Sequence, residues 1–297
     1  MQPACHICQS QASFLMKKDG FDLYRCPVCK LVFVHPMVPI ETLRTEVYSE
    51  ASGFQANRAV AVEEIAELPR ARGVFEYLQR VSPRTSILDV GASGGFFVSW
   101  ALKRGFRAQG VELNGRLAAS AKAQGYDVFH GTLAEAPESM SGYGAIFLGE
   151  VIEHVPDPRD LVRDCKKRLA PGGRLVITTP NLDCMWSTST FALYNWFGIP
   201  WSSCTPPYHV YQFSEVNLDR LLEQEGFKKE AEWYLPQPPL RYELGSLHLL
   251  KRYKQSRKIS DLLFMAFGFA LYIPWWGIVR VCAPILRKNF QMVKIYV

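Results

Sequence analysis

The chain has 297 residues, of which 48% are hydrophobic and 21% are charged, an ordinary balance for a globular protein. This length can bury a full core, so we expect one main domain with small additions. A formal charge of +6 and a pI near 8.8 permit contact with nucleic acid or an anionic membrane but require neither. The first residues lack the apolar run of a signal peptide. We therefore expect a cytoplasmic protein with reduced thiols, which argues against a disulfide framework.

Two CxxC pairs lie near the start of the chain, with seventeen residues between them: Cys5 and Cys8, then Cys26 and Cys29. Four thiolates at this spacing can surround a zinc ion as a tetrahedron, so residues 1–36 are predicted to form a zinc ribbon. The zinc is expected to be structural because four sulfur ligands leave no position for water. We expect His6, between the ligands, to be exposed to solvent and not bound to the metal.

Helices are expected over residues 40–80, after Pro36 and Pro39 break the chain. Apolar residues recur there at near-helical spacing: Val60, Val62, Ile65, Leu68, Val74, Phe75 and Leu78. We expect this segment to cover a ligand site that the next part of the chain forms.

A buried strand, a glycine turn and a helix are predicted over residues 87–104. The spacing Gly91-x-x-Gly94-Gly95 differs from the G-x-G-x-x-G of dinucleotide-binding loops. Asp89, just before the turn, would repel a pyrophosphate but attract a cation. S-adenosylmethionine (SAM) carries an ammonium, a sulfonium and one carboxylate, so this acid and the helix N-terminus both suit it. A strand-turn-helix without a ligand is the alternative.

A second acidic residue ends the next predicted strand, at 108–113. Glu112 follows Asp89 by 23 residues, near the spacing at which an acid holds the ribose hydroxyls in nucleotide-binding α/β folds. A solvated charge is the alternative. Further strands are predicted at 127–130 and 143–150. Strands that alternate with helices in this way indicate a doubly wound α/β sheet.

Three stretches resemble class I SAM-dependent methyltransferases. Residues 89–95 resemble their motif acid-x-Gly-x-Gly-x-Gly, with Ser93 at the middle glycine. Residues 150–158 resemble the E-x-x-E-H-x-x-D-P segment of ubiquinone-biosynthesis O-methyltransferases and related small-molecule and glycan-modifying enzymes. Residues 171–181 match a P-G-G-x-L-x-I-x-x-P-N run typical of the same family. The resemblance covers about 45–240 plus the last strand, and it implies a seven-strand Rossmann-like sheet.

The resemblance also implies which residues hold SAM. Tyr48 belongs to the helical segment that lies over the cofactor in such enzymes, although a packed aromatic is an equal alternative. The cofactor-binding residues implied are Asp89, Gly91, Ser93, Gly95, Glu112, Leu113, Thr132, Leu133, Gly149 and Glu150.

Two histidines are candidates for a catalytic base that accepts the proton of a hydroxyl group. His154 belongs to the E-x-x-E-H segment, and His209 begins a stretch that resembles a family segment at the mouth of the active site. Structural duty is the alternative for each. In some relatives the acids and the histidine of E-x-x-E-H bind a divalent ion, which implies Glu150, Glu153 and His154 here. Pairing or capping of Glu150 with His154 inside the fold is the alternative.

Residues 182–211 are predicted to form a long irregular segment, which we interpret as the acceptor pocket. The Thr-Pro-Pro-Tyr run at 205–208 mimics the NPPY signature of amino-group methyltransferases. That signature belongs at the end of the fourth strand, where Gly149 and Glu150 stand, so we do not interpret the run as a functional motif. A helix that Ser214 caps should follow, and then a strand near 232–234.

The C-terminal part departs from the minimal fold. A basic run at 251–258 precedes residues 262–279, which carry no charge and are long enough to span a membrane. The last strand must nevertheless return to the sheet, and Pro274 divides the apolar run. We therefore expect two short helices, folded near Pro274 and Gly277, that dip into the membrane interface beside lipid phosphates. Packing on the domain or on a second subunit is the alternative.

These observations predict three parts: a zinc ribbon at 1–36, a SAM-dependent methyltransferase domain at 37–240 with its last strand at 289–297, and a basic and apolar helical insertion at 241–288. The expected reaction is O-methylation of a small-molecule or lipid-linked acceptor, either a glycan sugar or a prenylated phenol. Methylation of RNA and a non-catalytic SAM-binding scaffold are the alternatives. We expect a cytoplasmic protein with peripheral contact to the inner face of the membrane through 251–288. Homo-oligomers are left open.

Overall fold

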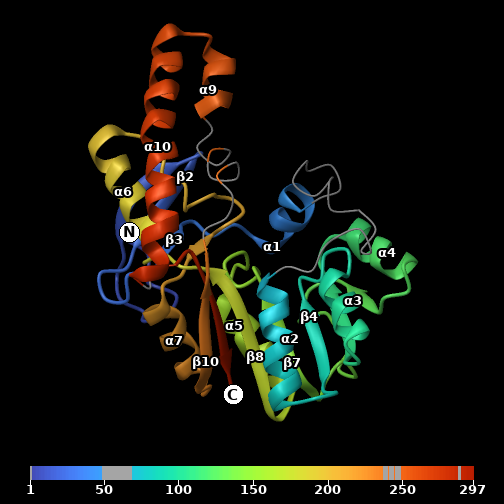
Figure 1. Cartoon of the computed structure of the whole chain (residues 1–297). Helices are drawn as coiled ribbons and strands as arrows, with labels where there is room; N and C mark the ends of the chain where they lie inside the picture. The colour runs from blue at the N-terminus through green and yellow to red at the C-terminus, as the bar shows by residue number, and fades with distance from the viewer. Residues whose placement is uncertain (1, 49–68, 237–239, 241–243, 245–248, 287–288) are drawn as a thin grey trace.

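The computed structural model describes residues 2–48, 69–236, 240, 244, 249–286 and 289–297 (Figure 1). Its centre is a seven-stranded sheet of strand order β10-β11-β8-β7-β4-β5-β6. The strands are β4 (Ser86–Val90), β5 (Arg107–Glu112), β6 (Val128–His130), β7 (Tyr143–Gly149), β8 (Leu169–Pro180), β10 (Lys229–Leu235) and β11 (Gln291–Tyr296). The five strands from β8 to β6 run parallel, whereas β11 is antiparallel to both of its neighbours. This arrangement confirms the predicted doubly wound α/β sheet.

Helices cover both faces of this sheet (Figure 1). They are α2 (Pro69–Val81), α3 (Phe96–Lys103), α4 (Gly115–Ala123), α5 (Pro158–Arg168) and α7 (Glu215–Gln224). On one face, Phe97 of α3 stacks between Phe75 of α2 and Phe147 of β7, with ring centroids 4.5 and 4.0 Å away. On the other face, α5 and α7 bury Val162 and Leu221. Strand β7 is a nearly continuous apolar run, as expected for a strand that is covered on both faces.

The segment 40–80 is helical where the structure describes it. The short α1 (Ile40–Thr42) continues into a single π-helical turn, η1 (Leu43–Val47), and α2 follows later. Val74, Phe75 and Leu78 are fully buried on α2, as the apolar spacing predicted. The remaining positions of that predicted pattern lie outside the described residues: Val60, Val62, Ile65 and Leu68.

A second, smaller sheet joins the N-terminal segment to the main domain. Its strand order is β1-β2-β3-β9, and its strands are β1 (Ser13–Lys18), β2 (Phe21–Arg25), β3 (Val32–Val34) and β9 (Tyr211–Gln212). The edge strand β9 comes from the chain between β8 and α7 and pairs with β3 through Phe33 opposite Tyr211. The small sheet and the α5 and α7 face of the large sheet therefore share one hydrophobic core.

Residues 182–211 contain a helix, so the prediction of a wholly irregular segment was wrong. Helix α6 (Met185–Phe197) begins after Cys184, whose Sγ accepts the Ser187 N–H at 3.2 Å, and ends at Gly198 with φ of 67°. Side-chain hydroxyls at 188–190 each donate to a carbonyl one turn earlier. These polar residues obscure the apolar helical period in the sequence.

The C-terminal insertion forms one long helix, so the prediction of two short helices was wrong. Helix α10 (Ile259–Ile285) continues through Pro274 and Gly277, and α9 (Leu249–Ser256) packs beside it (Figure 1). A proline inside a helix costs about 3 kcal/mol. Tyr272 and Val279, buried on either side of Pro274, supply the packing that opposes this cost. By length and composition, α10 is the one described helix that could cross a membrane.

A buried ion pair fastens β11 to α7. Lys294 is fully buried, and its Nζ lies 2.7 Å from Oδ1 of Asp219, which also accepts the Tyr296 hydroxyl at 2.6 Å. Burial alone would raise the pKa of Asp219, but hydrogen bonds from Lys294 and Tyr296 outweigh it and lower the pKa. The carboxylate therefore stays ionised inside the domain.

We predict that Asp219→Ala lowers the free energy of unfolding by about 3 kcal/mol, because it leaves the buried Lys294 ammonium without this carboxylate. The stabilisation is fully present above the unfolded-state pKa of 3.8 and is lost as pH falls through the lower folded-state value. Urea unfolding measures both effects. Asp164→Ala is the control, because Asp164 pairs only with exposed Lys167 among the described ion pairs and should cost less than about 1 kcal/mol. Equal losses in the two variants would contradict this account.

Candidate active site

The strand order places a ligand site at the carboxyl end of β4. From β4 the chain goes to β5 on one side, whereas β7, reached later, lies on its other side. Such a reversal opens a crevice between the loops that follow the parallel strands, and ligands of open α/β sheets bind there. Seven of the ten residues that were predicted to hold SAM lie in the loops after β4, β5, β6 and β7. The other three, Asp89, Glu112 and Gly149, lie within the last two residues of β4, β5 and β7.

The glycine turn after β4 has the backbone that a close ligand approach requires. Gly91 and Gly95 adopt φ of 78° and 86°, where glycine is unstrained. A Cβ on Gly91 would lie 2.6 Å from Cγ2 of Val151, and a Cβ on Gly95 would lie 2.9 Å from Cδ2 of Tyr126. Ser93 also adopts a positive φ, 52°, a region that a glycine enters more readily. The backbone at Ser93 therefore has a conformation that favours glycine, the residue that the family motif has at this position.

Glu112 ends β5 beside this turn. Its carboxylate is buried and accepts the backbone N–H of Ser93 and of Asn114, both at 2.7 Å. Asn114 also caps α4, where its Oδ1 accepts the Leu117 N–H at 3.0 Å, and its Nδ2 donates to the carbonyl of Tyr48 at 2.5 Å. Two adjacent loops and the N-terminal helical segment are therefore held around one carboxylate. Asp89 is buried on β4, two residues before Gly91.

The loop after β6 is fastened to η1. Thr132 donates its N–H and hydroxyl to Oε2 of Glu135, at 2.7 and 2.9 Å. Arg44 of η1 forms a bidentate ion pair with the same carboxylate, at 2.8 and 2.9 Å. The Thr132 N–H and the Arg44 guanidinium together lower the pKa of Glu135 to about 2. Leu133 is buried, and Leu113 is half-buried beside Glu112.

Glu150 is directed toward the sheet. Glu150 itself adopts a positive φ of 58°. Its Oε1 accepts hydrogen bonds from the Thr178 hydroxyl at 3.1 Å and from the Gln291 amide at 2.5 Å. The structure therefore does not bring Glu150 into a cluster with Glu153 and His154, which the predicted divalent site required. Glu153 and His154 instead lie with His209, and their ligand atoms fall within 4.8 Å of one another. Two imidazoles and one carboxylate are a ligand set that a divalent transition metal accepts.

The two histidines predicted as candidate bases lie side by side. Their ring centroids are 4.8 Å apart and the planes are nearly perpendicular, at 81°. Nδ1 of His154 lies 2.6 Å from the carbonyl oxygen of Tyr208 and 2.8 Å from the hydroxyl of Tyr48. A carbonyl can only accept, so Nδ1 carries a hydrogen and neutral His154 presents Nε2 as an acceptor. Nε2 lies 3.8 Å from Oε1 of the buried Glu153.

His209 is neutral at physiological pH. Burial is the main cause that lowers its pKa well below the ordinary value, and the nearby His154 and Lys18 lower it further.

Tyr48 contacts both parts of the site. Its carbonyl accepts a hydrogen bond from Asn114 beside the glycine turn, and its hydroxyl forms a hydrogen bond with His154. The sequence had placed Tyr48 in this region.

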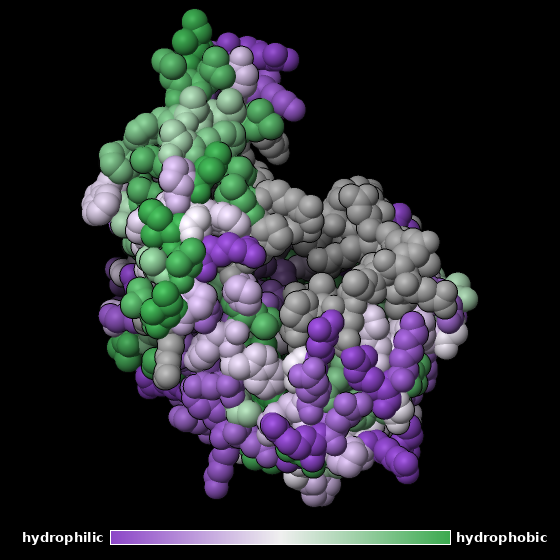
Figure 2. Space-filling view, in the orientation of Figure 1, coloured by the Kyte–Doolittle hydropathy of each residue, from purple (hydrophilic) through white to green (hydrophobic). Residues whose placement is uncertain are grey.

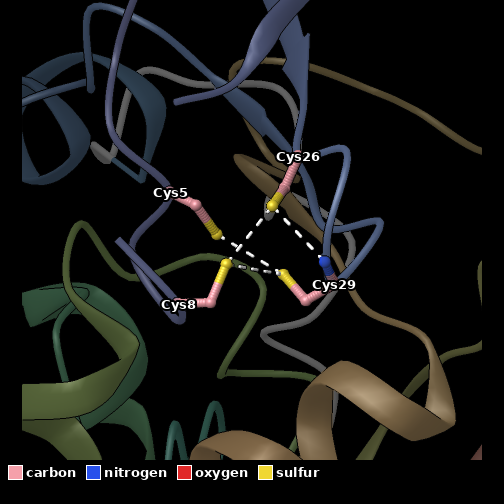
Figure 3. Close-up of side chains that lie close together, drawn as sticks. All are labelled: Cys5, Cys8, Cys26 and Cys29. Carbon is pink, nitrogen blue, oxygen red and sulfur yellow. Dashed lines mark hydrogen bonds between the residues drawn. The ribbon is translucent and has the colours of Figure 1, made fainter. Parts of the chain in front are cut away.

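The four predicted zinc ligands form one cluster (Figure 3). Their sulfurs lie 3.3 to 3.8 Å apart in the pairs Cys8 with Cys26, Cys5 with Cys29, and Cys8 with Cys29. Tetrahedral zinc with bonds of 2.3 Å requires sulfurs about 3.8 Å apart, so this donor set fits zinc. The two CxxC turns share one backbone conformation, since Gln9 and Lys30, each four residues after the first cysteine, adopt φ of 61° and 63°.

The N-terminal segment that carries the cysteine cluster, predicted to be a zinc ribbon, contacts the segment that carries His209. Tyr211 of β9 donates its hydroxyl to the carbonyl of Pro156 at 2.9 Å and lies 2.8 Å from Nδ1 of His6. His6 is therefore half-buried and hydrogen-bonded, so the prediction that it is exposed to solvent was wrong. Burial lowers the pKa of His6, which keeps its imidazole neutral in this contact. Asn217 of α7 donates to the carbonyl of Cys29 at 3.3 Å.

A family model described as a methyltransferase domain matches residues 62–232, more than half of the chain. This chain belongs to that methyltransferase family. The resemblance to class I SAM-dependent methyltransferases is thus confirmed, together with the Rossmann-like fold.

Several curated methyltransferases are similar to part of the chain. A ubiquinone biosynthesis O-methyltransferase of Marinobacter nauticus is 32% identical over 103 residues, 32% of this chain and 43% of that protein. The corresponding enzyme of Sodalis glossinidius is 28% identical over 166 residues, 46% of this chain and 67% of that protein. A probable S-adenosylmethionine-dependent methyltransferase of Mycolicibacterium smegmatis is 27% identical over 53% of this chain and 57% of its own length. The chain spans about half the length of these relatives.

Solved methyltransferase structures overlay on most of the chain. A SAM-dependent methyltransferase from Archaeoglobus fulgidus is 17% identical with a TM-score of 0.47, covering 76% of this chain and 93% of its own. One from Mesorhizobium loti is 15% identical with a TM-score of 0.48, covering 80% of this chain and 99% of its own.

Some residues of the methyltransferase site were missed by sequence reasoning. Asn114 and Glu135 carry a detectable signal, since each stands beside the expected start of a helix or turn. Tyr208 contacts His154 through its backbone carbonyl. Every residue has such a carbonyl, so the sequence could not identify this contact. Tyr211 could be identified only once β9 was known to join the ribbon.

We predict that removal of zinc loosens the His209 segment as well as the ribbon. A strong chelator, or the double variant Cys26→Ser/Cys29→Ser, should abolish stoichiometric zinc and raise amide hydrogen exchange across 205–212, because β9 loses its ordered partner β3. Zinc analysis and hydrogen-exchange mass spectrometry measure the two effects. Cys282→Ser on α10, outside the cluster, is the control. Zinc loss with unchanged exchange in this segment would contradict the coupling.

Proposed function

We propose that this protein transfers the methyl group of SAM to a hydroxyl oxygen of a small-molecule or lipid-linked acceptor. The observation that carries the proposal is the position of His154 and His209. His154 is connected to the glycine turn through Tyr48 and Asn114, and His209 packs against His154. The curated relatives named ubiquinone biosynthesis O-methyltransferases support an oxygen acceptor.

The residues around the turn suit SAM. The backbone N–H groups at the start of α3 suit the carboxylate of SAM. The glycines at 91 and 95 allow the cofactor to approach the backbone closely. Asp89 supplies a negative charge for the ammonium or sulfonium. Glu112 is in place for the ribose hydroxyls. When bound, SAM supplies an electrophilic methyl carbon.

The chain contributes orientation and a proton acceptor. In an in-line displacement, the acceptor oxygen forms a bond to the methyl carbon as the bond from carbon to sulfur breaks, and the hydroxyl proton must leave. Nε2 of His154 can take this proton, since Nδ1 is held by the Tyr208 carbonyl. Oε1 of Glu153 lies 3.8 Å from the same Nε2, where a carboxylate charge would favour the imidazolium that results. Half-buried His209 beside it stays neutral, so it adds no positive charge next to His154.

The positions of two sequence motifs favour a hydroxyl acceptor over an amino group. The Thr-Pro-Pro-Tyr run at 205–208 lies in the loop before β9, and Gly149 and Glu150 occupy the end of β7 where the signature of amino-group enzymes would stand. A glycan sugar or a prenylated phenol offers the hydroxyl that this arrangement requires. Methylation of RNA is less well supported, because the basic run at 251–258 flanks the apolar helix α10.

We predict that methyl-labelled SAM transfers its label to phenol or glycolipid extracts, and that His154→Gln lowers kcat by about 10²–10⁴ without changing the Kd for SAM. His35→Gln, on the ribbon edge, is the control.

Three results would contradict the proposal. Label that enters only added RNA would favour the RNA methyltransferase. SAM binding without transfer to any acceptor would favour the non-catalytic scaffold. An unchanged kcat in His154→Gln would remove this residue from catalysis.

A further inference from the structure

Helix α10 presents a continuous apolar face to solvent. Its 27 residues give a length of about 40 Å at 1.5 Å per residue, and residues 262–279 carry no charge. One face packs on the protein through Gly268, Tyr272 and Val279. The opposite face exposes Leu263 and Val281, both at 65%.

The end of α6 extends this face. Trp196 is 73% exposed, and Phe197 makes an edge contact with Phe267 of α10 at 5.6 Å between centroids. We call the exposed apolar side chains of α10, together with Trp196 and Phe197, the docking ridge. Figure 2 shows hydrophobic side chains along almost the whole projecting arm. Apolar surface of this extent on a soluble domain marks an interaction site.

Basic residues stand at the tip of the arm, where α9 turns into α10. Lys254, Arg257 and Lys258 are exposed there, and Figure 2 shows hydrophilic side chains at the same end. Arg252 is partly neutralised, because it pairs with Asp261 at 2.7 Å. The tip therefore combines positive charge with adjoining apolar surface, which matches an anionic bilayer surface and does not match a second copy of the same positive tip.

The contacts of α10 argue against a membrane-spanning orientation. Tyr272 donates to the carbonyl of Pro200 at 3.0 Å and Trp275 to the Ser189 hydroxyl at 2.7 Å, so the helix lies against α6. The chain then returns to the large sheet through β11. A crossing would detach these contacts and carry the basic tip through the hydrocarbon. The ridge can instead lie parallel to the bilayer plane.

We propose that the docking ridge binds the surface of an anionic membrane, with its apolar side chains in the outer acyl region and the basic tip on lipid phosphates. Helices with an apolar face and flanking Lys or Arg bind in this way. Membrane binding would give the proposed enzyme access to lipid-linked acceptors, and only this link rests on the proposed function. Membrane binding itself can be measured without methyl transfer.

Vesicle co-sedimentation tests the ridge. The full chain should bind phosphatidylcholine vesicles that contain phosphatidylglycerol, and Leu263→Ser/Val281→Ser should weaken binding at least tenfold. Phe14→Ser/Val216→Ser is the matched control, because these side chains are 56% and 68% exposed away from the ridge. The Kd for SAM should be the same in all three proteins, so that a failure to bind vesicles is distinct from a failure of the proposed reaction.

The basic tip has its own test. Lys254→Gln/Arg257→Gln/Lys258→Gln should lower the partition coefficient by on the order of a hundredfold, at about fivefold per charge, and added salt should have a similar effect on the wild type. Lys103→Gln/Arg107→Gln/Lys122→Gln is the control, since these residues are exposed on α3, β5 and α4. Equal binding by all variants would overturn the proposal. A stable dimer that is lost in Leu263→Ser/Val281→Ser, without vesicle binding, would overturn it in favour of a second copy of the chain.

Discussion

The pairing of β9 with β3 is the constraint on which the acceptor side of this protein depends. The N–H groups of Val210 and Tyr211 both donate to the Glu153 carbonyl, at 2.9 and 3.1 Å, while Phe33 pairs with Tyr211 across the small sheet. The segment that carries His209 is therefore held by the ribbon on one side and by the Glu153 segment on the other. Four cysteines whose sulfurs fit zinc lie at the base of that ribbon, and four sulfur ligands would leave a bound metal no open position for a reactant.

The cofactor side is organised around a different interaction, the carboxylate of Glu112. It orders two loops by accepting two backbone N–H groups, and Asn114 then connects these loops to Tyr48. Tyr48 contacts His154, so a single aromatic residue joins the two sides. Buried charges of this kind are costly unless they are satisfied, which explains why polar contacts in the site are short and numerous.

Sequence reasoning found the features that depend on local spacing. The CxxC pairs, the glycine turn and Glu112 carry their chemistry in a few neighbouring residues, and the alternation of strands and helices indicated the sheet. Features that depend on contacts between distant segments were not predictable. Strand β9 joins the N-terminal sheet, where Tyr211 pairs with Phe33, and α10 continues through Pro274 because packing on α6 outweighs the local penalty. The divalent site that the family resemblance implied included Glu150. Its contact with Gln291 joins distant parts of the chain, so the sequence could not predict it.

Isothermal titration of the purified, zinc-loaded protein with SAM tests the central claim most directly, because every assigned role depends on the cofactor at the end of β4. We expect saturable binding that Glu112→Ala weakens about 10- to 100-fold, as the loss of a charged hydrogen-bond partner costs about 1.5–3 kcal/mol. Glu138→Ala, an exposed acid on the loop before β7, should bind as the wild type does. Folded, zinc-loaded protein that binds neither SAM nor its demethylated product would contradict the account.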